Sequence, residues 1–307
     1  MRYINMIVLV IASTLLGIPV DAVIVEGRDF SSADAAARAL VSAAKSNDVT
    51  ALIEILGPAS KDILTTSDPV ADRKIRQKFA ERAAAKMKLV GEPGKPDAKT
   101  LVVGKDEWPL PIPIVRVSGR WHFNVEQGKQ EILMRRIGSN ELDAIEVCRG
   151  YVEAQNVYSE KDRTGNGVQY AQKIISAPGK HDGLYWASSG DNDESPIDEI
   201  VARAFAEGYT SRHNPYHGYY FKILTAQGSH ASGGAMSYLQ GGLMTKGFAL
   251  IAWPSDYRST GIMTFLVDKS GIVYQKDLGP QTPELASACK VYNPNETWTP
   301  VSISARK

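Results

Sequence analysis

The stretch that decides the fold runs over residues 131–162, "EILMRRIGSNELDAIEVCRGYVEAQNVYSEKD". Apolar side chains recur at steps of three and four residues, at Leu142, Ile145, Cys148 and Val152. That spacing places them on one face of a helix, and further apolar residues flank the stripe. The pattern therefore predicts one long helix, or a broken pair, that buries a wide face against a large partner surface.

Gly150 stands in the middle of this predicted helix. A glycine in a helix interior costs about 1 kcal/mol relative to alanine. We therefore expect another backbone to approach the helix closely at this position.

Strand signals follow the helix in the second half of the chain. They are "YYFKILTA" at 219–226, "GFALIAWP" at 247–254 and "GIMTFLVDKSGIVYQKD" at 261–277. In the last, the apolar residues flank a polar turn at 268–271, which predicts a hairpin. Residues 131–307 thus form a domain in which a long helix packs on an antiparallel sheet.

Upstream, residues 23–130 predict a smaller α+β domain. Three helices are expected, the first capped by Ser31 or Ser32, the second by Asn47 or Asp48, and the third over 67–90. Strand-like segments then follow at 99–104, 111–119 and 120–126. The predicted fold class of the whole chain is α+β, with helices on a small antiparallel sheet in this first domain.

The N-terminus resembles an export signal in its composition. A cation at Arg2 precedes an apolar run from Met6 to about Val20, shorter than the roughly 20 residues of a spanning helix. Val20-Asp21-Ala22 suits a signal peptidase, so residues 1–22 are predicted as a signal peptide, with the mature chain periplasmic or secreted. An uncleaved membrane anchor is the alternative; no later stretch is long enough to span a membrane.

Charge and cysteine content narrow the function classes. Lys and Arg total 35 against 34 for Asp and Glu, so no net field attracts nucleic acid. Cys148 and Cys289 are the only cysteines. In an oxidising compartment they could form a bridge worth roughly 4–5 kcal/mol, or remain two buried thiols.

Two polar stretches are candidate sites. His213 and His217 have the four-residue spacing of a zinc pair, but Pro215 and Gly218 favour a turn that leads into the strand at 219. In "SGDNDESPIDE", the loop Asp191–Glu194 could hold calcium through oxygens of Asp191, Asn192 and Asp193; alternatively, the segment starts a helix with Asp198 and Glu199 near its N-terminus.

Nucleophile and nucleotide-binding motifs are missing from the sequence. We therefore predict no catalytic, cofactor-binding or metal residue and no cofactor.

In the first domain, helices that lead into a curved sheet resemble the nuclear-transport-factor-like folds. The resemblance implies a small-molecule pocket lined by Trp121 and Phe123, opposite His122; the alternative is that both aromatic residues belong to the core.

The second domain resembles the globular part of type IV pilins and of the pseudopilins of type II secretion. The resemblance rests on "NELDAIEVCRGYVEAQNVYSEK", "GYYFKILT" and "KGFALIAWPSDYRSTGIMTFLVDKSGIVYQKD", and covers about residues 135–280. It implies a helix across an antiparallel sheet. The charged segment "EQGKQEILMRRIGSN" replaces the hydrophobic assembly helix of pilins, so polymerisation through such a helix is not expected.

Across nearly its whole mature length the chain also resembles the bacterial domain-of-unknown-function family 2950. The matching phrases include "ALIEILGP", "EWPLPIPIVRVSGRWHFNVEQGKQEILMRRIGSNEL", "HDGLYW", "PYHGYYFKILTAQG" and "GIVYQKDLGP". The family implies no activity. The sequence thus predicts an exported, non-catalytic envelope protein that binds or assembles with an envelope or secretion-system protein; the alternative is a periplasmic small-molecule binder or enzyme.

Overall fold

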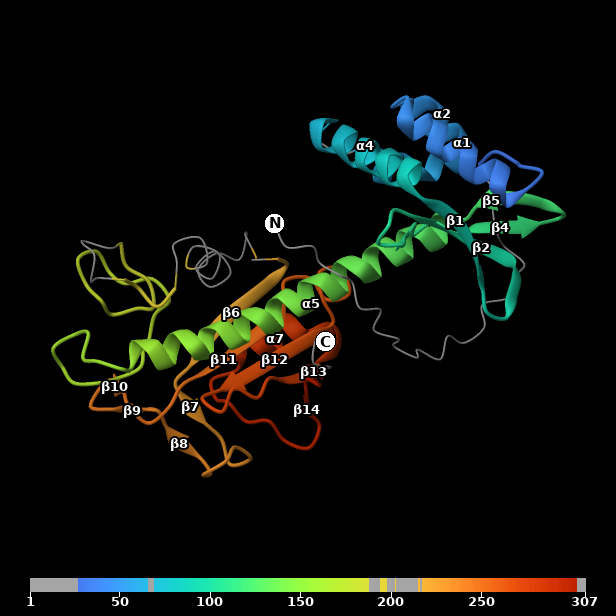
Figure 1. Cartoon of the computed structure of the whole chain (residues 1–307). Coiled ribbons are helices and arrows are strands. Elements are labelled where there is room, and N and C mark those ends of the chain that lie inside the picture. The colour runs from blue at the N-terminus through green and yellow to red at the C-terminus, as the bar shows by residue number, and fades with distance from the viewer. Residues whose placement is uncertain are drawn as a thin grey trace. The chain divides into compact units, whose positions relative to one another are not determined.

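The computed structural model describes residues 27–65, 69–187, 194–197, 202, 215 and 217–302 (Figure 1). The chain divides into two compact units, with the boundary between Ile132 and Leu133. Helices and antiparallel sheets occur in both units, which confirms the predicted α+β class. The predicted signal peptide at 1–22 lies outside the described residues.

The first unit places helices on a small antiparallel sheet. Its strands are arranged in the order β1-β2-β4-β5, with β3 paired to β2. The elements are α1 (Ala33–Lys45), α2 (Val49–Leu56), the 3₁₀ helix η2 (Pro58–Ser60), α3 (Lys61–Leu64), α4 (Pro69–Ala85), β1 (Met87–Glu92), β2 (Lys95–Val103), β3 (Trp108–Pro109), β4 (Ile114–Val117) and β5 (Arg120–Phe123).

The first two helices of this unit begin where the sequence predicts, whereas the short helices η2 and α3 were not expected. The Ser32 side chain accepts a hydrogen bond from the Ala35 N–H at 3.1 Å, and Asp48 caps α2 in the same way. The predicted third helix is too long, because α4 ends at Ala85 and the chain continues as β1. There Leu89 pairs with Leu101 of β2, so strand pairing overrides the helical propensity of the segment.

The second unit contains a long helix and a second antiparallel sheet, in the order β14-β13-β12-β11-β6. Its helix α5 starts before the unit boundary. The elements are α5 (Val125–Tyr158), β6 (Tyr219–Leu224), β7 (Ala226–Gln227), β8 (Met236–Ser237), β9 (Leu239–Gln240), β10 (Leu243–Met244), β11 (Ala249–Pro254), β12 (Met263–Asp268), β13 (Tyr274–Asp277), the 3₁₀ helix η3 (Gly279–Gln281), α7 (Thr282–Ala288) and β14 (Thr299–Pro300).

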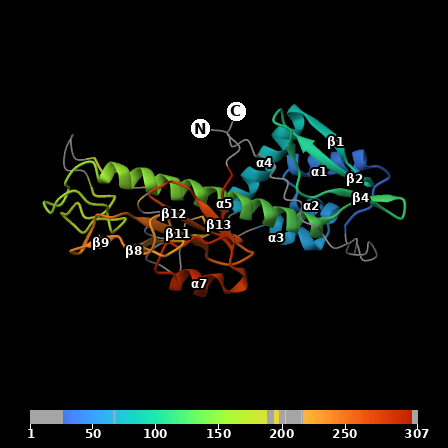
Figure 2. The same cartoon turned by 90° about the horizontal axis from the view of Figure 1, so that it is seen from below.

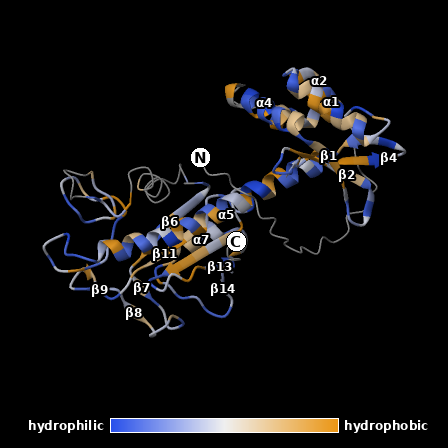
Figure 3. Ribbon diagram, viewed as in Figure 1, coloured by the Kyte–Doolittle hydropathy of each residue, from blue (hydrophilic) through white to orange (hydrophobic). Residues whose placement is uncertain are grey.

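The helices α5 and α7 lie on opposite faces of this sheet (Figure 2). The central strands β11 and β12 are almost entirely buried, and apolar residues are concentrated there (Figure 3). The predicted hairpin is confirmed: the Gly271 N–H donates to the Asp268 carbonyl at 3.0 Å, and β12 pairs with β13. Within the described ranges, no helix combines the length and the apolar composition needed to cross a membrane.

Two details of the α5 prediction are wrong. Leu142 is 59% exposed, whereas Ile145, Cys148 and Val152 of the same predicted stripe are buried. A methyl group added at Gly150 would meet no atom within 4 Å, so no backbone approaches there. The buried face of α5 is therefore narrower than the sequence suggests, and Gly150 lies beside it.

Candidate functional site

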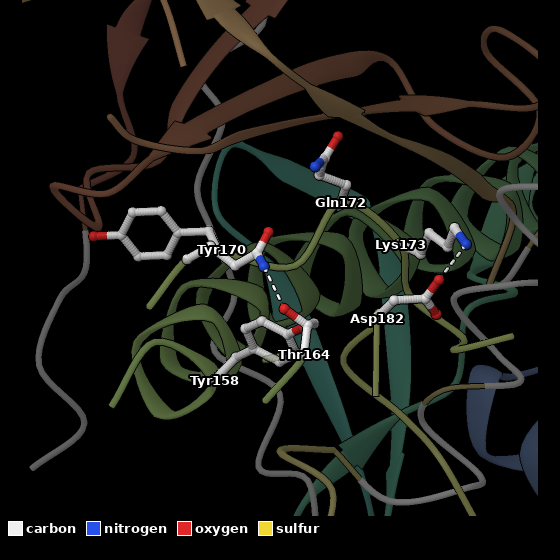
Figure 4. Close-up of a pocket in the computed structure, with 7 residues that line it drawn as sticks. Tyr158, Thr164, Tyr170, Gln172, Lys173 and Asp182 are labelled. Atoms are coloured by element: carbon white, nitrogen blue, oxygen red, sulfur yellow. Dashed lines mark hydrogen bonds and ion pairs between the residues drawn. The ribbon is translucent and has the colours of Figure 1, made fainter. Parts of the chain in front are cut away.

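A pocket of about 160 Å³ opens in the second unit at the C-terminal end of α5. The chain after the helix, residues 159–187, folds back against it with only isolated β-bridges (Figure 4). The pocket is lined by Tyr158, Thr164, Gln169, Tyr170, Gln172, Lys173 and Asp182. The lining thus combines two phenols, a hydroxyl, two carboxamides and one ion pair.

Gln155 holds this loop against α5. The side chain is fully buried, its Nε2 donates to the Ala171 carbonyl at 2.8 Å, and its Oε1 accepts from the Ala171 N–H at 2.8 Å. Nε2 also lies 3.0 Å from the Tyr151 hydroxyl. Since both backbone groups of Ala171 are paired with one amide, the pocket residues on either side of Ala171 are fixed relative to the helix.

A turn at Asp162 forms one rim of the pocket. Its carboxylate accepts from the N–H groups of Gly167, Thr164 and Gly165 at 2.8–3.0 Å, and these bonds, led by that of Gly167, lower the pKa of Asp162. Both glycines have positive φ, which favours glycine at these positions. The turn brings Thr164 into the lining of the pocket, where its Oγ1 accepts a hydrogen bond from Gln169 Nε2 at 2.7 Å.

On another side of the pocket, Lys173 faces Asp182 (Figure 4). Lys173 Nζ lies 2.6 Å from Asp182 Oδ2, and Asp182 Oδ1 accepts from the Ala177 N–H at 2.8 Å. Burial opposes ionisation of Asp182, but the bonds from Lys173 and Ala177 outweigh it and lower its pKa. The Asp182 carboxylate is therefore ionised near neutral pH, and its charge offsets that of the Lys173 ammonium group.

Tyr158 forms the wall between the pocket and the core. Its hydroxyl donates to the His181 carbonyl at 2.6 Å, and burial raises its pKa to about 12, so it stays protonated. The Arg163 guanidinium lies over the rings of both Tyr158 and Trp186, at 5.7 and 5.3 Å from their centroids. These contacts fix the ring of Tyr158 in place.

A second polar cluster joins α5 to the start of β6. His217 lies in the turn before β6, as the sequence predicts, with φ at 45°. Its Nδ1 lies 2.5 Å from Asp143 Oδ2 of α5. His213, the other histidine of the predicted pair, lies outside the described residues.

The neighbouring contacts of α5 are structural. Glu141 Oε1 accepts from the N–H groups of Ile262 and Met263 at 2.9 and 3.0 Å, and burial raises its pKa. Asn140 Nδ2 donates to the Thr260 carbonyl at 2.9 Å. Together these bonds fasten the chain before β12 to the helix, so this cluster supports the fold rather than a reacting group.

The strand β1 leaves one side of the first sheet open. The Gly104 N–H donates to the Lys86 carbonyl at 2.8 Å, so bonding to β2 continues at every second residue from Lys86. The backbone N–H and C=O groups of Met87 and Leu89 therefore point away from β2. Among the described residues, no strand pairs with that side of β1.

Side chains on β1 are also exposed. Met87 is 36% and Val90 41% exposed, and the two side chains lie on opposite faces of the strand. The register shifts between Gly91 and Glu92, so a regular edge is available only before that bulge. The other side of this sheet is covered, because Phe30 exchanges two backbone hydrogen bonds with Trp121 of β5 at 2.9 Å.

The calcium hypothesis is not tested, and the described cysteines form no site. Asp191 and Asp193 of the calcium hypothesis lie outside the described residues. Among the residues that are described, no three His, Cys, Asp or Glu side chains are grouped so as to hold a metal ion. Cys148 and Cys289 are free thiols, and burial raises the pKa of Cys148 to about 12.

The pocket predicted in the first unit is filled with core side chains. Phe123 is buried in the hydrophobic core, and Trp121 packs against the same core. A pocket that does open in this unit is lined by other residues, Pro58, Ala59, Lys61, Asp62, Thr65 and Lys129. The structure therefore favours the core alternative for Trp121 and Phe123.

Sequence reasoning missed the pocket beside α5. Lys173 and Asp182 are nine residues apart in a segment without helical or strand periodicity, so no pattern links them. The phrase "DRTGNG" at 162–167 was a usable signal, because Asp followed by two glycines favours a turn. The role of Gln155 carries no sequence signal.

These observations define a two-unit α+β protein with a small polar pocket and an open strand edge. Residues 27–301 match DUF2950, a family described as "Protein of unknown function", and the chain belongs to this family. That confirms the family predicted from the sequence phrases. No curated protein and no solved structure matches the chain, so the likeness to pilins and pseudopilins stays a prediction.

Proposed function

We propose that this protein is exported and acts as a non-catalytic binding or assembly protein of the cell envelope. Its partner, an envelope or secretion-system protein, adds an extended segment to the open side of β1. The observation that carries the proposal is the outward direction of the Met87 and Leu89 backbone groups on an exposed strand.

Strand addition draws its affinity from main-chain hydrogen bonds. Two outward residues supply four backbone groups, and each bond formed contributes about 0.5–1.5 kcal/mol net. The side chains of Met87 and Val90 add apolar surface that a partner would remove from water. An unpaired strand edge is a ready template for another chain, and a lysine on the edge, here Lys88, restricts which chains can pair with it.

The ends of the second sheet are less suitable. β14 has only two residues, and Pro300 lacks a backbone donor. On β6, four of the six residues are buried and none is exposed. Among the described strands, β1 is the edge that best combines exposure with outward backbone groups.

Charge around β1 favours an acidic partner. Lys86 and Lys88 both lie 2.8 Å from one carboxylate, Glu107, which leaves one positive charge in excess. Lys99, opposite Gly91 in the register, adds a further cation. An extended segment that alternates apolar and acidic side chains would complement this surface.

Export and the pilin-like character of the second unit belong to the same proposal. The apolar run ahead of Val23 supports export. The pilin-like part is supported by the order of elements, a long helix followed by an antiparallel sheet. N-terminal sequencing of the chain from the periplasmic or extracellular fraction should begin at Val23; a cytoplasmic chain that keeps Met1 would contradict export.

The partner is tested by photo-crosslinking in the cells that make the protein. A photoreactive amino acid at Val90 should link reproducibly to one envelope or secretion-system protein, identified by mass spectrometry. The Val90→Glu variant, probed from Met87, should lose that link, because the added charge repels an acidic segment. Val168→Glu, at an exposed valine of the second unit, is the matched control and should keep it. Crosslinks only within the chain, or a link that survives Val90→Glu, would rule out strand addition at β1.

A further inference from the structure

The pocket beside α5 is not used by the proposed strand addition and needs its own explanation. We propose that it binds a single small, neutral, polyhydroxylated molecule such as a monosaccharide. The proposal rests on the size of the pocket, its balanced charge and the hydrogen-bonding groups that its lining leaves available.

The size of the pocket limits the ligand. Its volume of about 160 Å³ corresponds to about five waters at the density of the liquid. Sites for drug-sized ligands are larger, roughly 300–1,000 Å³. A single sugar ring is on the right scale, whereas an oligosaccharide would have to extend out of the pocket.

The charge of the lining favours a neutral ligand. Lys173 and Asp182 are already joined at 2.6 Å, so they leave no net charge for a ligand to neutralise. An anion would compete with Asp182 for the ammonium group, and a cation would compete with Lys173 for the carboxylate. A neutral molecule can bind beside the intact pair, and each ion can still contribute charge-assisted hydrogen bonds.

The remaining hydrogen-bonding groups suit hydroxyls. Lys173 has three N–H donors, of which the ion pair uses one. Gln172 donates through Nε2 to the Gly242 carbonyl at 2.8 Å and keeps its Oε1 as an acceptor. Thr164 accepts from Gln169 and keeps its O–H as a donor. A sugar hydroxyl both donates and accepts, so a polyol can satisfy such a mixed set.

The apolar part of the lining suits the C–H face of a sugar ring. Tyr158 and Tyr170 contribute aromatic surface to the pocket. The hydroxyl of Tyr158 is fixed on the His181 carbonyl, and the ring of Tyr170 packs on Phe248 at a centroid distance of 4.8 Å. Because the lining is held by Gln155 and by these contacts, binding should require little ordering of the protein.

Binding can be measured on the full chain by ligand-observed NMR and by isothermal titration. Suitable probes are glucose, galactose and N-acetylglucosamine, with glycine and inorganic phosphate as charged comparators. We expect at least one sugar to saturate the protein with a dissociation constant on the order of 1 mM, as befits a small ligand in a half-open pocket. Lys173→Met and Gln172→Ala should each weaken that binding at least about tenfold, a loss of about 1.4 kcal/mol.

The control is Lys276→Met, which removes a half-buried lysine of β13 in the same unit, whose Nζ donates to Thr297 Oγ1 at 2.7 Å. It should bind the sugar like the parent chain, and circular dichroism should show that all three variants are folded. Lys173→Met also tests the pocket if Gln172→Ala fails to fold, since Lys173 lies on the exposed side of its ion pair. The proposal is overturned if no sugar saturates below about 100 mM, if glycine or phosphate binds more tightly than every sugar, or if binding survives in the folded pocket variants.

Discussion

Replacing Gln155 by leucine should destabilise the second unit severely. The substitution keeps an apolar stem in the buried site but removes the amide that pairs with both backbone groups of Ala171. A buried backbone group left without a partner costs about 1–3 kcal/mol, so the two groups predict a loss of roughly 2–6 kcal/mol. Against a typical total of about 5–15 kcal/mol, this is a large share of the free energy of unfolding.

Gln155→Glu separates the two hydrogen bonds. The carboxylate can still accept from the Ala171 N–H, but it cannot donate to the Ala171 carbonyl, and burial raises its pKa. When protonated, the same side chain can do both. Because a raised folded-state pKa means that the folded protein binds the proton more tightly, this variant should gain stability relative to the parent as pH falls from 7 to about 5.

The assay is urea unfolding, with native-state hydrogen exchange at the Ala171 amide as the local readout. Asn156→Leu, at the exposed neighbouring position of α5, is the control and should change stability by less than about 0.5 kcal/mol. A loss below about 1 kcal/mol for Gln155→Leu, with unchanged protection of the Ala171 amide, would refute the assignment of Gln155 as the residue that holds the pocket loop.

Three further outcomes are expected. In thermal unfolding, Gly150→Ala in α5 should stabilise the protein by about 0.5–1 kcal/mol, because the added Cβ meets no other atom. Gly128→Ala in the same helix should destabilise it by about 1–3 kcal/mol, because the added Cβ would lie 2.6 Å from Ile112. In urea unfolding at pH 7, Glu141→Gln should stay within about 1 kcal/mol of the parent protein, since the amide oxygen still accepts the two N–H groups. Because the pKa of Glu141 is raised in the folded protein, the parent should become more stable relative to this variant as pH falls. Glu141→Ala, which removes the acceptor, should lower the free energy of unfolding by about 1–3 kcal/mol. The hydrogen bonds from Lys86 and Lys88 lower the pKa of Glu107 from 4.5 to about 2. The parent should therefore be more stable than Glu107→Gln above pH 4.5, and this difference in the free energy of unfolding should disappear as pH falls to about 2. A difference that does not change with pH would contradict the ion pairs.

The sequence predicted the fold correctly where an element's boundary depends on residues close to it in the chain. Ser32 and Asp48 cap the first two helices, and the polar turn after Asp268 joins β12 to β13, because caps and turns depend on neighbouring residues. The end of α4 was missed because "KMKLV" has no breaker, and its strand conformation depends on pairing with β2. Leu142 was wrongly predicted to be buried, because the spacing of apolar residues shows which face of a helix is buried but not how far along the helix that face extends.

The pocket could not be predicted for a related reason. Its position depends on Gln155 pairing with Ala171, a contact between a helix side chain and a loop backbone sixteen residues away. Any buried glutamine could play this part, and the periodicity of α5 says only that position 155 faces inward. Polar residues in irregular segments therefore reveal a site only after the fold has brought them together, whereas the open edge of β1 follows from the strand order of the folded sheet. For this reason the strand-addition proposal can be tested at one exposed residue, while the sugar proposal has to be tested at groups that act jointly in the folded loop.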